Sequence, residues 1–129
     1  MNILNFKNIE QIKRGLSKKK IFRKKENKIN KIIIDFSNDN NDFKNFINVY
    51  NILKDINISI PKIYEIYFDK KLIIMEDFGE RNFDKLINEK ELYNLLKLAV
   101  DNIIIIQNSI NQDKLSNLKK YNYNELKKE

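Results

Sequence analysis

The segment from Pro61 to Gly79 constrains the fold of this chain more than any other part of the sequence. Two apolar stretches, KIYEIYF and LIIME, are separated by a short turn at Asp69 and Lys70. Strands joined by so short a turn pair antiparallel, and Pro61 prevents a helix from entering the first of them. The second stretch ends at Glu76 and is followed by residues 77–79, which close with a glycine. We therefore expect free backbone amides where this strand leaves the sheet.

The segments on either side of this hairpin predict further strands and helices. Residues 21–25 and 31–37 are predicted to form two strands around a polar turn. The second of these segments carries a run of three isoleucines, which are β-branched and favour strands. Apolar residues then recur every three or four positions, which predicts an amphipathic helix over residues 41–55 with Asn41 as its N-cap. The same spacing in residues 1–13 predicts a short helix or an arm.

A long helix is predicted from Glu89 to Ile110, after a start that resembles a capping box at Asn88 and Glu91. Its apolar stripe is too wide for a small sheet to cover, and we expect much of it to be exposed. The order of elements is that of an α+β unit with helices on one side of an antiparallel sheet. The stripe consists of Leu92, Leu95, Leu96, Ala99, Val100, Ile103, Ile106 and Ile110.

Composition excludes several kinds of chemistry. The 129 residues contain no cysteine and no histidine, so disulfides, thiolate metal sites and histidine-based catalytic triads are excluded. With 42% hydrophobic and 33% charged residues, the chain has enough apolar side chains for one globular core. Its N-terminus lacks the pattern of a signal peptide and no apolar run approaches the length of a membrane span, so we expect a soluble, cytoplasmic protein without a membrane partner.

The net charge of +7 is concentrated in residues 1–31, which carry +9, whereas the rest carries −2. A basic arm on a nearly neutral body is one pattern of a non-catalytic module that binds RNA or another acidic partner. Lysine outnumbers arginine by 22 to 3, however, and proteins that read phosphates favour arginine for its bidentate fork. Nucleic-acid binding is therefore the alternative and not the leading interpretation.

Two motifs resemble those of the aminoglycoside phosphotransferase and choline kinase-like family, and are most similar to its bacterial N-acetylmuramate and N-acetylglucosamine kinase branch. The run from Gly15 to Arg23 is similar to the glycine and serine turn and basic-aromatic strand that open these kinases. The run from Leu72 to Gly79 is similar to the apolar strand and Glu-Asp-Leu-Gly hinge of the family, and is the more specific of the two. The chain departs from protein kinases at Asp35, which stands where they carry a phosphate-binding lysine.

The resemblance implies a protein-kinase-like N-terminal lobe, an antiparallel sheet with one packed helix, that binds ATP and Mg²⁺. The backbone from Glu76 to Phe78 would bind the adenine edge, Met75 would form an apolar wall, and the Gly15 turn would cover the phosphates. We do not expect the triplet at residues 77–79 to bind magnesium as its protein-kinase counterpart does, because no catalytic loop precedes it. The nucleotide-binding residues that the resemblance implies are Gly15, Ser17, Phe22, Arg23, Ile33, Met75, Glu76, Asp77 and Phe78.

Intact members of the family continue into a helical lobe that carries an H-G-D-x-H-x-x-N catalytic loop, and the 129 residues contain no such motif. The resemblance therefore implies three parts: an N-terminal helix or arm (1–14), a nucleotide-binding lobe (15–79), and the first part of an incomplete C-terminal lobe (80–129). It also implies an amino-sugar substrate for the intact kinase and possible pairing with a separate C-terminal lobe. We expect this chain by itself to bind nucleotide and to transfer no phosphate.

Overall fold

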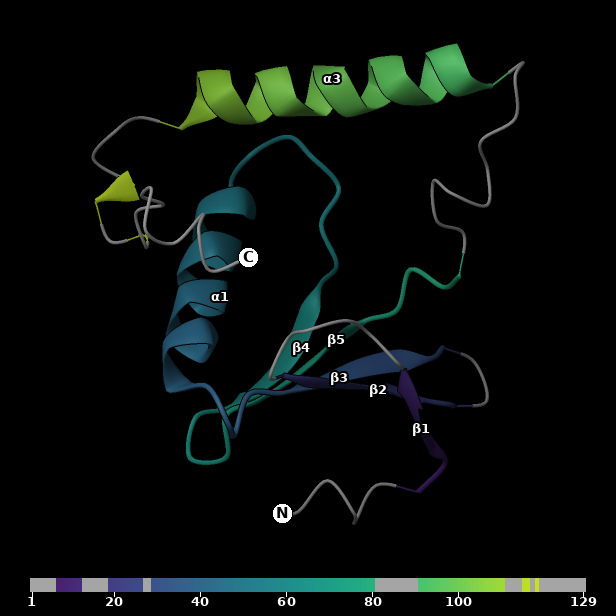
Figure 1. Cartoon of the computed structure of the whole chain (residues 1–129), viewed down its shortest axis with the longest axis vertical. Helices are drawn as coiled ribbons and strands as arrows, with labels where there is room; N and C mark the ends of the chain where they lie inside the picture. The colour runs from purple at the N-terminus through teal and green to yellow at the C-terminus, as the bar shows by residue number, and fades with distance from the viewer. Residues whose placement is uncertain are drawn as a thin grey trace, which may run out of the picture.

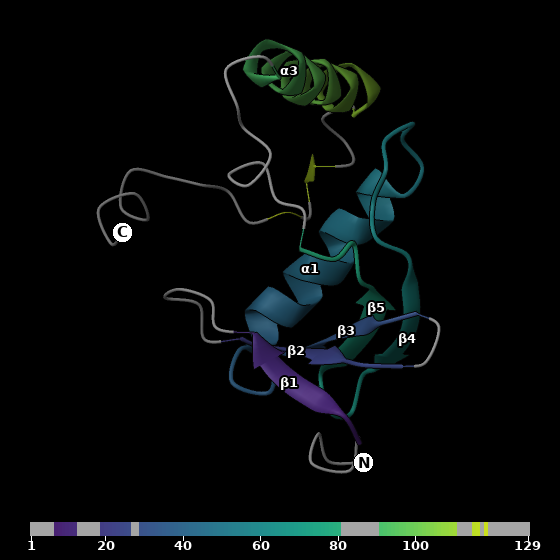
Figure 2. The same cartoon turned by 90° about the vertical axis from the view of Figure 1, so that its right-hand side faces the viewer.

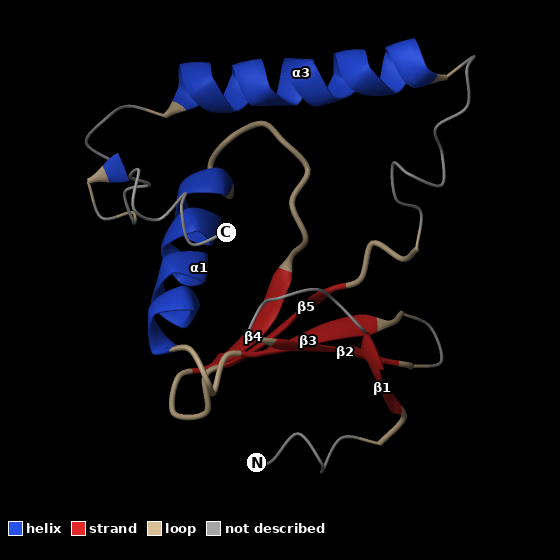
Figure 3. Ribbon diagram, in the orientation of Figure 1, coloured by secondary structure: helices blue, strands red, loops and turns tan. Residues whose placement is uncertain are grey.

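The chain is an α+β protein in which a five-stranded antiparallel sheet carries one helix on one of its faces (Figures 1 and 3). The computed structural model describes residues 7–12, 19–26, 29–80, 91–110, 115, 116 and 118. A second, longer helix lies at the opposite end of the molecule from the sheet, as two perpendicular views show (Figures 1 and 2).

The strands lie in the order β1-β2-β3-β5-β4, and every neighbouring pair is antiparallel. Both hairpins predicted from the sequence are confirmed. The pair that follows Pro61 forms one edge of the sheet and the isoleucine-rich strand lies at its centre. The strands are β1 (Ile9–Ile12), β2 (Lys20–Lys24), β3 (Lys31–Asp35), β4 (Ile63–Tyr67) and β5 (Leu72–Glu76).

The helix predicted for residues 1–13 is wrong over the part that the structure describes. Ile9–Ile12 is a strand, and its four residues pair in continuous register with Ile21–Lys24 of β2. The spacing of Ile9 and Ile12 fits a helix, but four residues gain more from pairing with an exposed strand edge than from a single helical turn.

Register divides the side chains of the sheet between two faces, because directly opposed residues on neighbouring strands point the same way. Ile21, Ile34 and Ile73 are opposed across β2, β3 and β5, and belong to the core beneath the helix. Their sequence neighbours Phe22, Ile33 and Ile74 are likewise opposed, and lie on the other face.

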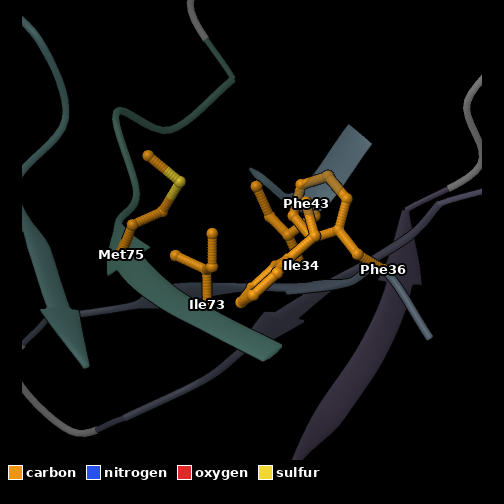
Figure 4. Packing of buried hydrophobic residues seen from close by; sticks show 5 residues of the cluster. All are labelled: Ile34, Phe36, Phe43, Ile73 and Met75. Atoms are coloured by element: carbon orange, nitrogen blue, oxygen red, sulfur yellow. The ribbon is translucent and has the colours of Figure 1, made fainter. Parts of the chain in front are cut away.

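Helix α1 (Asn40–Leu53) covers the first of these faces. Phe36, fully buried at the end of β3, packs at 5.7 Å from Phe43 and 5.4 Å from Phe46, measured between ring centroids. Figure 4 shows Phe36 and Phe43 beside Ile34, Ile73 and Met75, which complete the buried cluster. This cluster lies between α1 and the three central strands, and Ile33, Leu72 and Ile74 are also buried, on the other face of the sheet.

The N-cap of α1 is Asp39 and not the predicted Asn41. Asp39 has extended backbone angles, with φ −149° and ψ 93°, and its Oδ1 accepts a 3.0 Å hydrogen bond from the backbone N–H of Asp42. Asn41 lies one residue inside the helix, which begins at Asn40. At the other end of α1, the Tyr50 hydroxyl accepts a hydrogen bond from the N–H of Ile63 and joins the helix to β4.

Helix α3 (Leu92–Ser109) confirms the predicted long helix but begins three residues later than expected. The predicted cap at Asn88 lies outside the described residues, and Glu91 occupies the N-cap position without a side-chain hydrogen bond to the helix. No residue of α3 is buried. Among the described residues, no helix has the length and apolar character needed to cross a membrane.

Candidate functional site

The candidate site lies where β5 leaves the sheet, at residues 77–79, which we call the exit segment. It begins directly after the buried strand Leu72–Glu76 and ends at Gly79, whose φ is +82°. Residues that carry a side chain rarely adopt this backbone conformation, whereas glycine adopts it freely. A Cβ at Gly79 would meet nothing within 4 Å, so the backbone angle and not lack of space accounts for glycine here.

Asp77 is held by Arg23 of β2 in a two-pronged ion pair. Arg23 Nε donates to Asp77 Oδ2 at 2.6 Å, and Nη2 donates to Oδ1 at 3.3 Å. The same Oδ1 accepts a 2.8 Å hydrogen bond from the backbone N–H of Gly79. Both carboxylate oxygens of Asp77 therefore have partners, and one of them closes the turn of the exit segment.

The ion pair is shielded on one side and open on the other. The side chains of Arg23 and Asp77 are 15% and 4% exposed, whereas Glu80, which accepts from Arg23 Nη1 at 2.6 Å, is 71% exposed. The pKa of Arg23 is raised above its ordinary value, chiefly by its hydrogen bond to Asp77, with a further contribution from Glu80. The arginine is thus firmly charged and faces two carboxylates.

Glu76 uses its polar groups to hold the start of β4. Its backbone N–H donates to the carbonyl of Lys62 at 2.8 Å, and its Oε2 accepts from the N–H of Lys62 at 3.0 Å. The N–H of Glu76 is therefore already bonded to Lys62, whereas the resemblance implied that the backbone from Glu76 to Phe78 binds the adenine edge.

Phe78 is the residue of the exit segment that faces solvent, with 59% of its surface exposed. Within the described part of the chain, its backbone N–H donates to no other residue. A fixed amide without a partner can bind an acceptor atom of a ligand with little loss of conformational entropy. The exit segment therefore offers the N–H of Phe78, on its solvent-facing residue, as a donor.

The other predicted site residues fall on opposite faces of the sheet. Phe22 and Ile33 are directly opposed on the face away from α1, where Phe22 is half-buried and Ile33 has no exposed surface. Met75 lies on the α1 side, packed into the core cluster with Ile73 (Figure 4). Gly15 and Ser17 lie outside the described residues.

The described residues do not fit a magnesium site. They contain no group of three carboxylates that could hold a metal ion, and both oxygens of Asp77 are occupied by protein groups. Asp35, the residue in place of the kinase lysine, accepts from the backbone N–H of Ser37 and stabilises the turn after β3.

Several lysines of the basic N-terminal region are paired with carboxylates. Lys24 and Lys31 both contact Glu26, at 2.6 and 3.2 Å, and these hydrogen bonds lower the pKa of Glu26. Lys25 contacts Glu10 at 2.8 Å and lowers its pKa in the same way. This pairing reduces the positive charge that the described part of the region offers to an acidic partner.

Sequence reasoning missed two features of the site. Arg23 and Asp77 are 54 positions apart, and no pattern in the sequence indicates that they pair with each other. Glu80 follows Gly79 directly but matches no motif that we recognised. The strand order places β3 between β2 and β5, and the sequence did not determine this order.

No protein-family model, no curated protein and no solved structure matches this chain. The functional assignment therefore depends on the motifs quoted above and on the geometry of the site.

Proposed function

We propose that this chain is the ATP-binding lobe of an aminoglycoside phosphotransferase-like kinase that acts on an amino sugar or a related small molecule. Adenine binds at the exit segment, with the N–H of Phe78 donating to a ring nitrogen. The observation that carries the proposal is this donor, unpaired among the described residues, on a segment that ion pairing and a backbone hydrogen bond hold in place.

The aromatic ring of Phe22 supplies the apolar surface on which the base packs. Phe22 lies on the face opposite α1 and is half-buried, so part of the residue remains exposed to solvent. The Arg23–Asp77 ion pair connects the backbone segments that carry Phe22 and Phe78, although the Phe22 ring points to the face of the sheet opposite the Arg23 side chain. An apolar surface beside one or two directional polar groups is the usual composition of a nucleotide site.

The architecture agrees with the lobe that the resemblance implies, because one helix packs on an antiparallel sheet and follows its third strand. The proposal is limited to binding. The described residues bring together no set of carboxylates that could supply a catalytic base and metal ligands, and phosphoryl transfer depends on such groups.

Replacing Phe22 tests the proposal, with a fluorescent ATP analogue as the ligand. Phe22→Ala removes the ring on which the base packs and is expected to raise the Kd roughly tenfold, since stacking of a base on an aromatic side chain contributes about 1–3 kcal/mol. Phe68→Ala is the matched control, because Phe68 is an exposed ring in the β4–β5 turn, at the other end of β5.

The control is expected to leave the Kd within about twofold of the wild-type value. The absence of saturable binding to the wild-type chain would contradict the proposal. An equal loss of affinity in both variants would place the base elsewhere than on Phe22.

A further inference from the structure

We infer that Arg23 and Asp77 are positioning residues, which fix the exit segment in its binding conformation before any nucleotide arrives. This inference rests on the proposed function and changes the roles of two residues in it. The resemblance implied that both contact the nucleotide, whereas the structure pairs them with each other. Their effect on the base is exerted through the backbone of Phe78.

Three hydrogen bonds converge on the Asp77 carboxylate. Asp77 accepts two hydrogen bonds from Arg23 and one from the N–H of Gly79. The guanidinium fixes the orientation of the carboxylate, and the carboxylate fixes the turn through the Gly79 amide. Phe78, between the two anchored residues, has little freedom to rotate its peptide plane.

The ion pair connects two strands that are not adjacent in the sheet. Arg23 stands opposite Ile32 of β3, and β3 separates β2 from β5 in the strand order. The arginine side chain therefore passes over β3 to reach Asp77. Ladder hydrogen bonds cannot connect β2 to the exit of β5, because the two strands are not neighbours, so the ion pair supplies this connection.

Both side chains of the ion pair are largely buried. Asp77 is 4% exposed and Arg23 is 15% exposed, so loss of either partner leaves a charge in a poorly hydrated position. The contact with Glu80 differs because that side chain is 71% exposed, and a pair open to water contributes little. The ordering effect is therefore assigned to Asp77, with Glu80 as a minor partner.

Amide hydrogen exchange in the nucleotide-free chain tests the ordering directly. Arg23→Lys keeps the charge but loses the fork, and Asp77→Asn keeps the shape but loses the charge. Each is expected to raise the exchange rate of the Gly79 amide about tenfold, the size of effect that a hydrogen bond to a charged group has. Glu80→Gln, which alters the exposed contact with the same guanidinium, is expected to change that rate by less than about twofold.

The double variant Arg23→Lys with Asp77→Asn distinguishes a coupled pair from two independent contributions. We expect it to raise the Gly79 exchange rate no more than the larger single change, because either substitution already breaks the same interaction. A double variant whose rate is the product of the two single effects would overturn the inference. So would an equal rise at the Ile74 amide of β5, since the pair would then support the whole sheet and not the exit segment.

Nucleotide affinity separates this inference from the proposed function. If the wild-type chain binds the fluorescent ATP analogue, Arg23→Lys and Asp77→Asn should each raise the Kd about tenfold, as the exchange rates do. Faster exchange with an unchanged Kd would overturn the positioning role. If the wild-type chain binds no nucleotide while the exchange rates change as expected, the proposed function is wrong, and the Arg23–Asp77 ion pair orders the exit segment for some other purpose.

Discussion

At the scale of single residues, Asp77, Phe78 and Gly79 have three different roles although they spell a well-known magnesium-binding triplet. Asp77 pairs with Arg23, Phe78 presents its N–H, and Gly79 provides a backbone angle of positive φ. Both carboxylate oxygens of Asp77 have protein partners. A short motif does not specify a function until its surroundings are known.

The N-cap of α1 shows what single-residue reasoning can and cannot predict. The sequence from Asn38 to Asp42 offers five residues, each Asn or Asp, that could cap a helix, and the helix itself was predicted correctly. The choice of Asp39 depends on the connection from β3, because the N–H of Asp39 donates to the carbonyl of Phe36 at 2.8 Å. That turn sets the backbone angles of the cap and is not visible in the sequence.

Replacement of the cap gives a prediction with a built-in control. Asp39→Ala removes the acceptor of the Asp42 amide and is expected to lower the free energy of unfolding by about 1 kcal/mol. Asn41→Ala, at the position that the sequence pattern favoured, is expected to leave it unchanged or to raise it slightly, because alanine is the better helix former. Urea unfolding followed by circular dichroism measures both, and a larger loss for Asn41→Ala would show that the cap is misassigned.

At the scale of elements, the two hairpins β2–β3 and β4–β5 were predictable and strand β1 was not. Each hairpin has a short turn and β-branched residues on both arms, so local information defines it. Strand β1 has four residues with apolar positions three apart, and its strand conformation depends on the open edge of β2. Elements of this length are determined by tertiary contacts and not by their own periodicity.

Helix α3 was predictable in extent and in exposure. Its 18 residues include only two charged side chains, Lys97 and Asp101, which form an ion pair with each other at 2.7 Å. Large apolar side chains of α3 are exposed to solvent, among them Leu92, Tyr93, Leu96, Leu98, Val100, Ile103 and Ile104. An exposed apolar surface of this kind favours association and dye binding.

Substitutions on α3 test the consequence of this exposure. Leu96→Lys with Ile103→Lys removes two exposed apolar side chains, and we expect the fluorescence of a bound hydrophobic dye to fall by roughly a third, in proportion to the apolar area lost. Asn94→Lys with Asn108→Lys adds the same charge to the same helix and keeps the apolar surface, so its dye fluorescence should stay near the wild-type value. Equal falls in both variants would assign the effect to charge.

At the scale of the whole molecule, the site depends on contacts between parts that are distant in the sequence. The strand order places β3 between β2 and β5, and Arg23 joins the outer two across it. The sequence indicated the exit segment and its glycine, because both lie within one continuous motif. It could not indicate the ion pair, because a lysine-rich and acid-rich chain offers many partners for each charge and only the folded sheet selects one.

The central claim is that the exit segment binds adenine, and amide chemical-shift mapping with a non-hydrolysable ATP analogue tests it most directly. We expect the largest shifts at Phe78 and Gly79, with smaller ones along β2 near Phe22, and little change at these amides with inorganic triphosphate, which has no base. Shifts confined to α3 or to residues beyond it would contradict the claim.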